Sequence, residues 1–366
     1  MEKDIFQTYK GRQILRREIK ALEKFESQIG HIPRFNIKNK KTTELNLKKS
    51  DISDFTPLNN LNNLQKLDLG WTKISDLSPL SKMTNLRSLD LTNTNVSDLT
   101  PLSELEYLRT LILAWSKVMD ISPLSSLKRL FSLNLEGTKV ADVSPLEETT
   151  SLRDLNVRRT RITDLSPLSS MKYLQLLDVS FTKITDLSPL SGMRNLRELN
   201  FEYTKVYALS PLKNITHLLN LDLEATEVFD FSPLSHLKKL RKLDLTHTKI
   251  SDLSPLENLT NLRELFLAGT DISDLSPIHT LTNLERLDLG DTEISDLYPL
   301  KHLNSLQQLD LWNTKVSSLY SLKDIQSLKE IYLRGTQIAE GSNYRRIMRN
   351  DKVIKILEKR GVKIVL

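Results

Sequence analysis

Hydroxyl and carboxylate side chains recur every 22 residues in this sequence, and such residues could supply a nucleophile, a general base or metal ligands. One column holds Thr or Ser in fourteen copies, from Ser50 to Thr336, with Ser50 and Ser116 as the only serines. A second column, four residues further on, holds aspartates: Asp54, Asp76, Asp98, Asp120, Asp142, Asp164, Asp186, Asp230, Asp252, Asp274 and Asp296.

The residues around these two columns do not favour catalysis. No histidine or acid recurs beside the hydroxyls, the six histidines are scattered, and the sequence has no cysteine, Gly-rich phosphate loop or His-Glu-x-x-His motif. We therefore expect no enzyme activity, no catalytic residue, no cofactor and no metal site. The hydroxyls are predicted to hydrogen-bond to the loop backbone and so to connect successive copies of the pattern, which would form adjacent coils of the chain. The aspartates are predicted to cap turns.

The columns belong to a 22-residue repeat, with thirteen complete units from Thr42 to Ser327 and a partial unit from Leu328. Counting from the first residue of a unit as offset 0, apolar residues occupy offsets 0, 3, 5, 10, 13, 16 and 19. In the unit that begins at Leu240, the alternation predicts a short strand at Leu243-Asp244-Leu245. Ser254 is predicted to cap a helical turn with Pro255 at its first position, and twelve of the thirteen prolines share this place.

These units predict an α/β solenoid, a right-handed superhelix with a parallel β-sheet on its concave side and 3₁₀ or short-helix turns on its convex side. One unit cannot bury enough apolar surface to fold alone, so the ends need caps. We expect an N-terminal helical cap over 1–41, a repeat array over 42–338 and a C-terminal helix-strand cap over 339–366.

The N-terminal cap is predicted from helical spacing within 12–29, and a helix lying on a membrane surface is the alternative. The apolar positions of this segment are Ile14, Leu15, Ile19, Leu22, Phe25 and Ile29. In the C-terminal cap, Asn343 to Lys359 is predicted to be a helix that ends at Gly361, with a strand over Val362–Leu366. Its inward side chains are expected to be Ile347, Val353, Ile354 and Leu357.

The units resemble the 22-residue leucine-rich repeats of the bacterial internalin family, and are also similar to those of the leucine-rich regulatory subunit of protein phosphatase 1. The Thr or Ser at offset 8 differs from the Asn that is usual in internalin-type repeats. The resemblance implies a leucine-rich repeat solenoid that recognises a protein partner on its concave face. It leaves two alternatives open, a regulatory subunit of a phosphatase-type enzyme and a host-directed bacterial effector.

The outward residues of the predicted sheet lie at offsets 2, 4, 6 and 7, where the units differ most. Offset 4 carries mainly Asp or Asn, which predicts either a polar ladder that keeps the sheet soluble or an acidic floor for basic partners. Large aromatics on the same face are predicted contact anchors. The predicted partner-binding residues are Trp71, Ile112, Trp115, Phe181, Tyr203, His247, Phe266, Trp312, Tyr332, Asp68, Asp90, Asp178, Asp222, Asp244, Asp288 and Asp310.

Nucleic acid is the competing partner class, suggested by a pI of about 9.2. A basic column at offset 9 supports it, comprising Lys73, Lys117, Lys139, Arg161, Lys183, Lys205, Lys249 and Lys315. However, residues 1–41 hold 11 basic and 5 acidic side chains and residues 337–366 hold 8 and 3, which leaves 33 basic and 38 acidic in 42–336. The array is thus mildly acidic, and a protein partner is favoured over nucleic acid.

The start of the sequence lacks the apolar core of a signal peptide, and no stretch approaches the ~18 apolar residues of a membrane span. We therefore expect a cytoplasmic monomer that does not insert into membranes.

Overall fold

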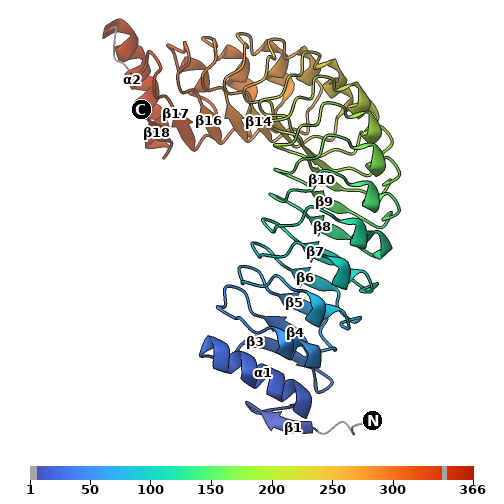
Figure 1. The fold of residues 1–366 in the computed structure, drawn as a ribbon. Coiled ribbons are helices and arrows are strands. Elements are labelled where there is room, and N and C mark those ends of the chain that lie inside the picture. Colours follow the sequence, from blue (N-terminus) through green and yellow to red (C-terminus); the bar gives the residue numbers. More distant parts are fainter. Residues whose placement is uncertain (1–5, 340–343) are drawn as a thin grey trace. The chain divides into compact units, whose positions relative to one another are not determined.

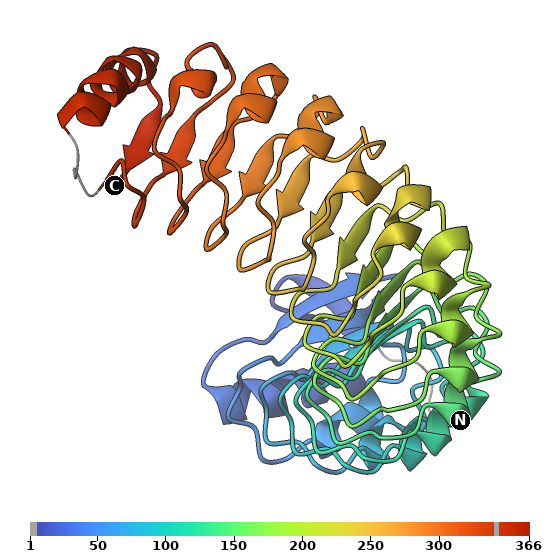
Figure 2. The same cartoon turned by 90° about the horizontal axis from the view of Figure 1, so that it is seen from above.

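A computed structural model of the chain describes residues 6–339 and 344–366. The chain divides into two compact units, Met1–Lys183 (unit 1) and Ile184–Leu366 (unit 2). In both, three-residue strands alternate with short 3₁₀ helices on the opposite side of each coil (Figures 1 and 2).

Unit 1 begins with two strands and a helix before its regular coils. The elements are β1 Phe6–Tyr9, β2 Arg12–Leu15, α1 Arg16–Ile29, β3 Arg34–Lys38, β4 Lys41–Asn46, β5 Lys66–Asp68, β6 Ser88–Asp90, β7 Thr110–Ile112, β8 Ser132–Asn134, β9 Asp154–Asn156 and β10 Leu176–Asp178. Its 3₁₀ helices are η1 Thr56–Asn60, η2 Ser78–Leu80, η3 Thr100–Leu102, η4 Ser122–Ser126, η5 Ser144–Leu146 and η6 Ser166–Leu168.

Unit 2 continues the same pattern and ends in a helix and a strand. Its strands and α-helix are β11 Glu198–Asn200, β12 Asn220–Asp222, β13 Lys242–Asp244, β14 Glu264–Phe266, β15 Arg286–Asp288, β16 Gln308–Asp310, β17 Glu330–Tyr332, α2 Tyr344–Lys359 and β18 Lys363–Val365. Its 3₁₀ helices are η7 Ser188–Leu190, η8 Ser210–Asn214, η9 Ser232–His236, η10 Ser254–Leu256, η11 Ser276–Thr280, η12 Tyr298–His302 and η13 Tyr320–Leu322.

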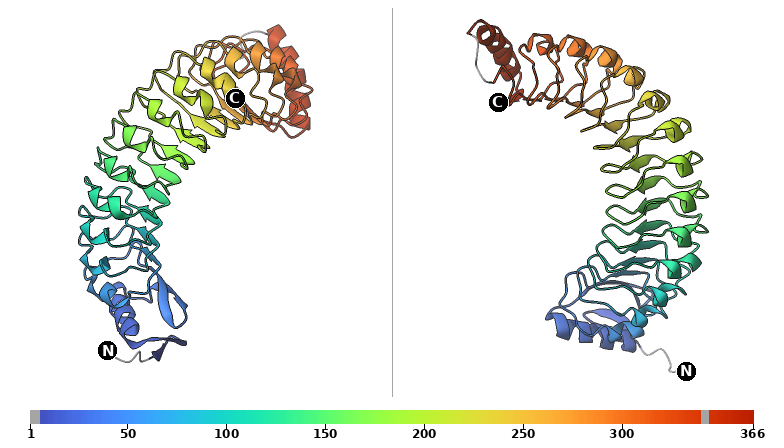
Figure 3. Two further views of the ribbon diagram at one scale, coloured as in Figure 1. Left: turned by 90° about the vertical axis from the view of Figure 1, so that its right-hand side faces the viewer. Right: turned by 45° about the horizontal axis from the view of Figure 1, so that its top comes forward.

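The strands pair in parallel with a register of one repeat. Lys66 lies opposite Ser88 and Asp68 opposite Asp90, and the coils of unit 2 pair in the same way. Each column of the repeat therefore becomes a row of neighbouring side chains. Figure 3 shows the stacked strands that carry these rows. The strands occupy offsets 2 to 4, so β13 is Lys242–Asp244, one residue earlier than the predicted Leu243–Leu245.

The core confirms the seven apolar columns. In the unit that begins at Leu240, every one of these side chains is buried, and the other coils repeat the pattern. The parallel sheet, the 3₁₀ turns and the helical ends confirm the predicted solenoid class.

The aspartate column forms turns as predicted. Each carboxylate accepts the backbone N–H two residues on, as Asp252 does from Ser254 at 2.8 Å, and fixes the entry into the 3₁₀ helix. Ser254 is not the cap that was predicted: it is the first helical residue, its hydroxyl donates to Asp252, and Pro255 follows at the second position. The prediction was wrong because the acceptor at the start of the helix is the carboxylate of Asp252, which takes the N–H of Ser254 itself.

The hydroxyl column is buried except for half-buried Ser50, and the hydrogen bonds of its threonines lie within a coil. Each threonine from Thr72 to Thr336 donates to the carbonyl oxygen three residues earlier, as Thr248 does to Leu245 at 2.6 Å. The predicted ladder between adjacent coils is therefore wrong, because the threonine Oγ1 lies close to the carbonyl at the end of its own strand. Ser116 departs from the pattern, since its buried hydroxyl finds no partner among the described residues.

The N-terminal end contains a helix over Arg16–Ile29, but the predicted helical spacing over 12–29 was wrong for Ile14 and Leu15, which lie in the strand β2. The sequence pattern also does not indicate the other strands of this end. β1 and β2 form an antiparallel hairpin, and β3 pairs antiparallel with β4. Within α1, the side chains of Ile19, Leu22 and Phe25 are buried, which satisfies the amphipathic pattern by packing against the array. Among the described residues, no helix combines the length and apolar character that a bilayer span requires.

The C-terminal end matches the predicted helix and strand. Gly361 follows α2 with φ of 83°, and β18 pairs in parallel with β17. Val353 and Leu357 are buried and Ile354 is half-buried, whereas the side chain of Ile347 lies outside the described part.

Candidate functional site

The residue at offset 7 of every coil has a left-handed backbone, and this set is called the left-handed column. All fourteen members have φ between 52° and 72°. They are Lys49, Trp71, Asn93, Trp115, Gly137, Arg159, Phe181, Tyr203, Ala225, His247, Gly269, Asp291, Asn313 and Gly335. Only glycine adopts this conformation without steric cost, so the bulky members are unusual.

The Asp or Asn at offset 4 builds the turn that leads into this column. Its side-chain oxygen accepts the N–H two residues on: Asp68 accepts from Gly70 at 3.0 Å and Asp244 from Thr246 at 3.0 Å. The same hydrogen bond is accepted by the offset-4 residues Asp90, Asp178, Asp222, Asp288 and Asp310. It is also accepted by the four asparagines at offset 4, Asn46, Asn134, Asn156 and Asn200. Apart from exposed Asn46, these side chains are half-buried, and they form turns. Neighbouring members lie opposite each other in the register of the sheet, as Asp68 and Asp90 do.

In unit 1 the left-handed column exposes two tryptophans, and one of them, Trp71, lies beside a lysine. Trp71 is 52% and Trp115 is 50% exposed. The Nζ atom of Lys49 lies 5.7 Å from the Trp71 ring centroid. The Trp115 ring covers Gly137, where a Cβ atom would lie 2.6 Å from Trp115 Cε3.

The other predicted residues of unit 1 are less exposed. Ile112 is half-buried at offset 4 of its strand. Phe181 is also half-buried, with the guanidinium carbons of Arg158 and Arg159 at 4.3 and 4.2 Å from its ring centroid.

In unit 2, Tyr203 and His247 are exposed members of the left-handed column, and Trp312 is 40% exposed one offset earlier. The Tyr203 hydroxyl donates to Glu224 at 3.1 Å. Half-buried Phe266 and Tyr332 lie at offset 4, where most coils have Asp or Asn.

Trp312 lies against Gly290 of the preceding coil, where a Cβ atom would be 1.9 Å from Trp312 Nε1. We expect Gly290→Ala to displace the indole ring and to lower the free energy of unfolding by about 1–3 kcal/mol, because the methyl group would overlap the Trp312 side chain. Gly192→Ala is the matched control, since nothing lies within 4 Å of the added Cβ. Near-UV circular dichroism and urea unfolding test this, and equal effects of both variants would contradict it.

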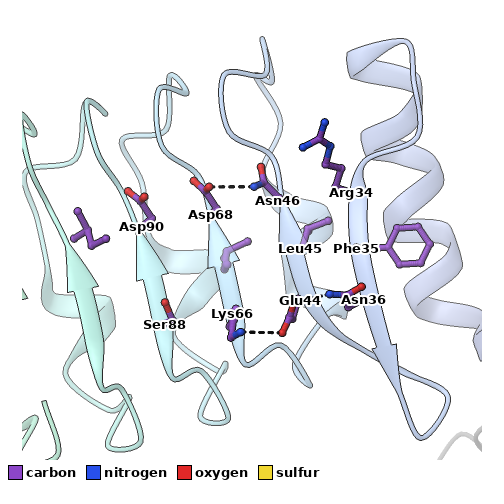
Figure 4. Close-up of a pocket in the computed structure, with 12 residues that line it drawn as sticks. Arg34, Phe35, Asn36, Glu44, Leu45, Asn46, Lys66, Asp68, Ser88 and Asp90 are labelled. Carbon is purple, nitrogen blue, oxygen red and sulfur yellow. Dashed lines mark hydrogen bonds and ion pairs between the residues drawn. The ribbon is translucent and has the colours of Figure 1, made fainter. Parts of the chain in front are cut away.

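A shallow hollow of ≈ 390 Å³ lies on the sheet face of unit 1, over β3 to β7 (Figure 4). Figure 4 shows Asn46, Asp68 and Asp90 side by side at the carboxyl ends of their strands, and Asn46 Nδ2 donates to Asp68 at 3.1 Å. At the other end of the strands Lys66 pairs with Glu44 at 3.1 Å. The hollow brings together the predicted residues Asp68, Asp90 and Ile112.

Burial alters the acidity of several offset-4 carboxylates. It raises the pKa of Asp68, Asp288 and Asp310 above the usual range. For Asp222, burial and then the nearby charge of Asp244 raise the pKa to about 7. The sheet face of unit 2 therefore carries less negative charge at neutral pH than its sequence suggests.

The raised pKa of Asp222 predicts a pH-dependent stability. Between the ordinary value of 3.8 and about 7, the folded chain keeps a proton that the unfolded chain releases. The free energy of unfolding should therefore fall as the pH rises through this window. Asp222→Asn should flatten that decline and stabilise the chain at pH 8, because an amide retains the turn, as Asn200 does.

Unfolding of Asp222→Asn measured between pH 4 and 8 tests this expectation. Asp252→Asn serves as a control, because hydrogen bonds from Ser254 lower the pKa of Asp252. A gain in stability at pH 8 for both variants, or for neither, would contradict the assignment.

The basic column at offset 9 is partly neutralised by acids of the same column. Lys73 lies 2.8 Å from Asp51, Lys249 lies 3.9 Å from Asp271, and Lys315 pairs with Glu293. These exposed pairs contribute little to stability, but they lower the positive charge that a nucleic acid would require.

Sequence reasoning missed the left-handed column, although a signal was present. Offset 7 holds Gly137, Gly269 and Gly335, together with Asn93 and Asn313, the residue types that best tolerate positive φ. Across residues 6–339 and 344–366, no group of three His, Asp or Glu side chains has an arrangement suited to a metal ion.

Comparison with known proteins agrees with this geometry. The family model described as leucine-rich repeats (2 copies) matches residues 63–104, 150–192 and 260–302, and a single-copy leucine-rich repeat model matches 236–253. The structure of an internalin, InlF, from Listeria monocytogenes has a TM-score of 0.76 and 26% identity, over 89% of this chain and 91% of that one. The chain is an internalin-like leucine-rich repeat protein.

Two further structures share the fold of this internalin-like protein. A leucine-rich repeat protein from Leptospira interrogans has a TM-score of 0.78 and 23% identity, over 87% of this chain and 82% of that one. PEPR1, solved with AtPEP1, has a TM-score of 0.61 and 20% identity, over 81% of this chain and 50% of that one. No curated protein sequence gives a significant match. At the general level, the shared fold is that of a protein-interaction scaffold.

Proposed function

We propose that this internalin-like protein is a non-catalytic scaffold that binds a protein partner through its sheet face. The contact anchors are the aromatic residues in and beside the left-handed column, with Trp71 and Trp115 foremost. Asp68 holds the turn that presents Trp71, whereas the Trp115 coil has Ile112 at offset 4.

The observation that carries the proposal is the conformation of the tryptophans. A bulky residue with positive φ costs on the order of 1–2 kcal/mol relative to its favoured conformation. Glycine occupies the same column at Gly137, Gly269 and Gly335, so the fold itself accepts the strain-free residue. A strained and half-exposed tryptophan is therefore best explained by binding, since strain of this kind concentrates at functional sites.

The chemistry of the face supports a protein partner. Tryptophan, tyrosine and arginine are the residue types most common at the energetic centres of protein interfaces, and this face has Trp71 beside Lys49 and Phe181 beside Arg158. PEPR1, solved with AtPEP1, is one structure of the same fold with a bound partner.

Affinity capture from the source cells tests the proposal. The immobilised wild type should retain a partner that Trp71→Ala/Trp115→Ala does not. Tyr298→Ala/Tyr320→Ala is the matched control, because these tyrosines are 59% and 63% exposed in the 3₁₀ helices, away from the sheet face. Equal capture by all three proteins would refute the proposed anchors.

A further inference from the structure

A second surface of unit 1 lies at the edge where the chain enters the strands. Aromatic and arginine side chains alternate there at offsets 21 and 1, and this set is called the arginine edge. It consists of Tyr107, Arg129, Phe131, Arg153 and Tyr173. The three rings are 46–56% exposed, and none of these residues belongs to the left-handed column.

The backbone places these residues in one continuous row. Phe131 N–H donates to the Arg109 carbonyl and Arg153 N–H to the Phe131 carbonyl, both at 2.8 Å, so the ladder of the sheet continues to this edge. Successive coils are therefore about 4.8 Å apart here, the spacing of paired strands.

The guanidinium groups stack on the aromatic rings. The guanidinium carbon of Arg129 lies 4.6 Å from the Tyr107 ring centroid. The guanidinium carbon of Arg153 lies 4.6 Å from the ring centroid of Tyr173 and 6.0 Å from that of Phe131. The Nη1 atom of Arg153 donates to the Tyr173 carbonyl oxygen at 3.3 Å. Stacking fixes a planar guanidinium while most of its N–H donors remain available for a carboxylate.

The charge of this edge is one-sided. Six basic side chains and one acidic side chain, Glu106, lie along it, at positions 84–87, 106–109, 128–131, 150–153 and 172–175. Within the described residues, neither Arg129 nor Arg153 forms an ion pair. Both guanidinium groups are therefore prepared for an anionic partner.

We propose that the arginine edge is a second interaction surface, which binds an acidic segment of a partner protein through carboxylate contacts to Arg129 and Arg153. A single-stranded nucleic acid fits less well for two reasons. The arginines already cover faces of the rings on which bases would stack, and residues 42–336 carry a net charge of −5, from 33 basic and 38 acidic side chains.

Fluorescence anisotropy with the full chain and a fluorescein-labelled peptide of eight glutamates tests this proposal at low salt. Arg129→Gln/Arg153→Gln should weaken peptide binding by about tenfold or more. Lys239→Gln/Arg241→Gln is the matched control, because it removes two charges at the same offsets in unit 2, and it should change binding by less than about twofold. Arg129→Lys/Arg153→Lys should lose about fivefold, because an ammonium keeps the charge but not the planar fork.

Several results would overturn the proposal. These are no peptide binding by the wild type, equal losses in the two glutamine variants, or full binding by the lysine variant. Tighter binding of an oligothymidine that is equally sensitive to Arg129→Gln/Arg153→Gln would assign the edge to nucleic acid instead. Trp71→Ala/Trp115→Ala should leave peptide binding unchanged, so this test is independent of the proposed function.

Discussion

Glu18→Ala should release the N-terminal helix from the array. Glu18 is fully buried in α1, and its two oxygens accept the Thr42 N–H at 2.6 Å and the Asn63 amide at 2.9 Å. Alanine would leave both donors without their acceptor, at a cost of about 3 kcal/mol. Amide hydrogen exchange in α1 and β4 should accelerate by about 100-fold, the ratio that such a free-energy change implies.

The control for this experiment is Glu23→Ala in the same helix, because Glu23 is exposed. It should leave the exchange rates nearly unchanged. Unaltered protection in Glu18→Ala, or equal acceleration in both variants, would show that the buried carboxylate does not hold the cap.

Trp71→Gly/Trp115→Gly should weaken partner binding strongly while it leaves the stability of the fold nearly unchanged. Glycine relieves the left-handed strain at both positions, which offsets the lost packing and the greater freedom of the unfolded chain. The free energy of unfolding should therefore change by less than about 1 kcal/mol. Affinity for the captured partner should fall by about 100-fold or more, because each buried tryptophan anchor typically contributes about 2 kcal/mol.

Calorimetry of unfolding and of partner binding on the same samples measures both effects. A marked loss of stability would mean that the tryptophans are structural. Retained affinity would mean that the partner binds elsewhere on the chain.

The periodic part of the fold was predictable, because one set of local rules repeats in every coil. The apolar columns, such as those of Leu243 and Leu245, the aspartate turns and the position of the 3₁₀ helices all follow from that period. The direction of the threonine hydroxyls was not predictable, since the sequence pattern does not specify whether the acceptor carbonyl lies in the same coil or in the next one. In the structure it lies in the same coil.

The aperiodic parts depend on long-range contacts. In the sequence, Glu18 cannot be told apart from an exposed helix glutamate, because its hydrogen-bond partners Thr42 and Asn63 lie 24 and 45 residues away along the chain. The arginine edge was missed for a similar reason: offsets 21 and 1 read as variable loop positions until the register places Arg153 between Phe131 and Tyr173. The aromatic candidates of the sheet face were found from sequence, but their left-handed conformation was not.

The central claim is that the tryptophans contact the partner, and the chain has three of them, Trp71, Trp115 and Trp312. Fluorine NMR of the chain labelled with 5-fluorotryptophan observes these rings alone, even when the partner contains tryptophan. At saturation, we predict that the signals of Trp71 and Trp115 shift and lose their solvent exposure. Unchanged shifts and exposure of all three signals in the saturated complex would contradict the account.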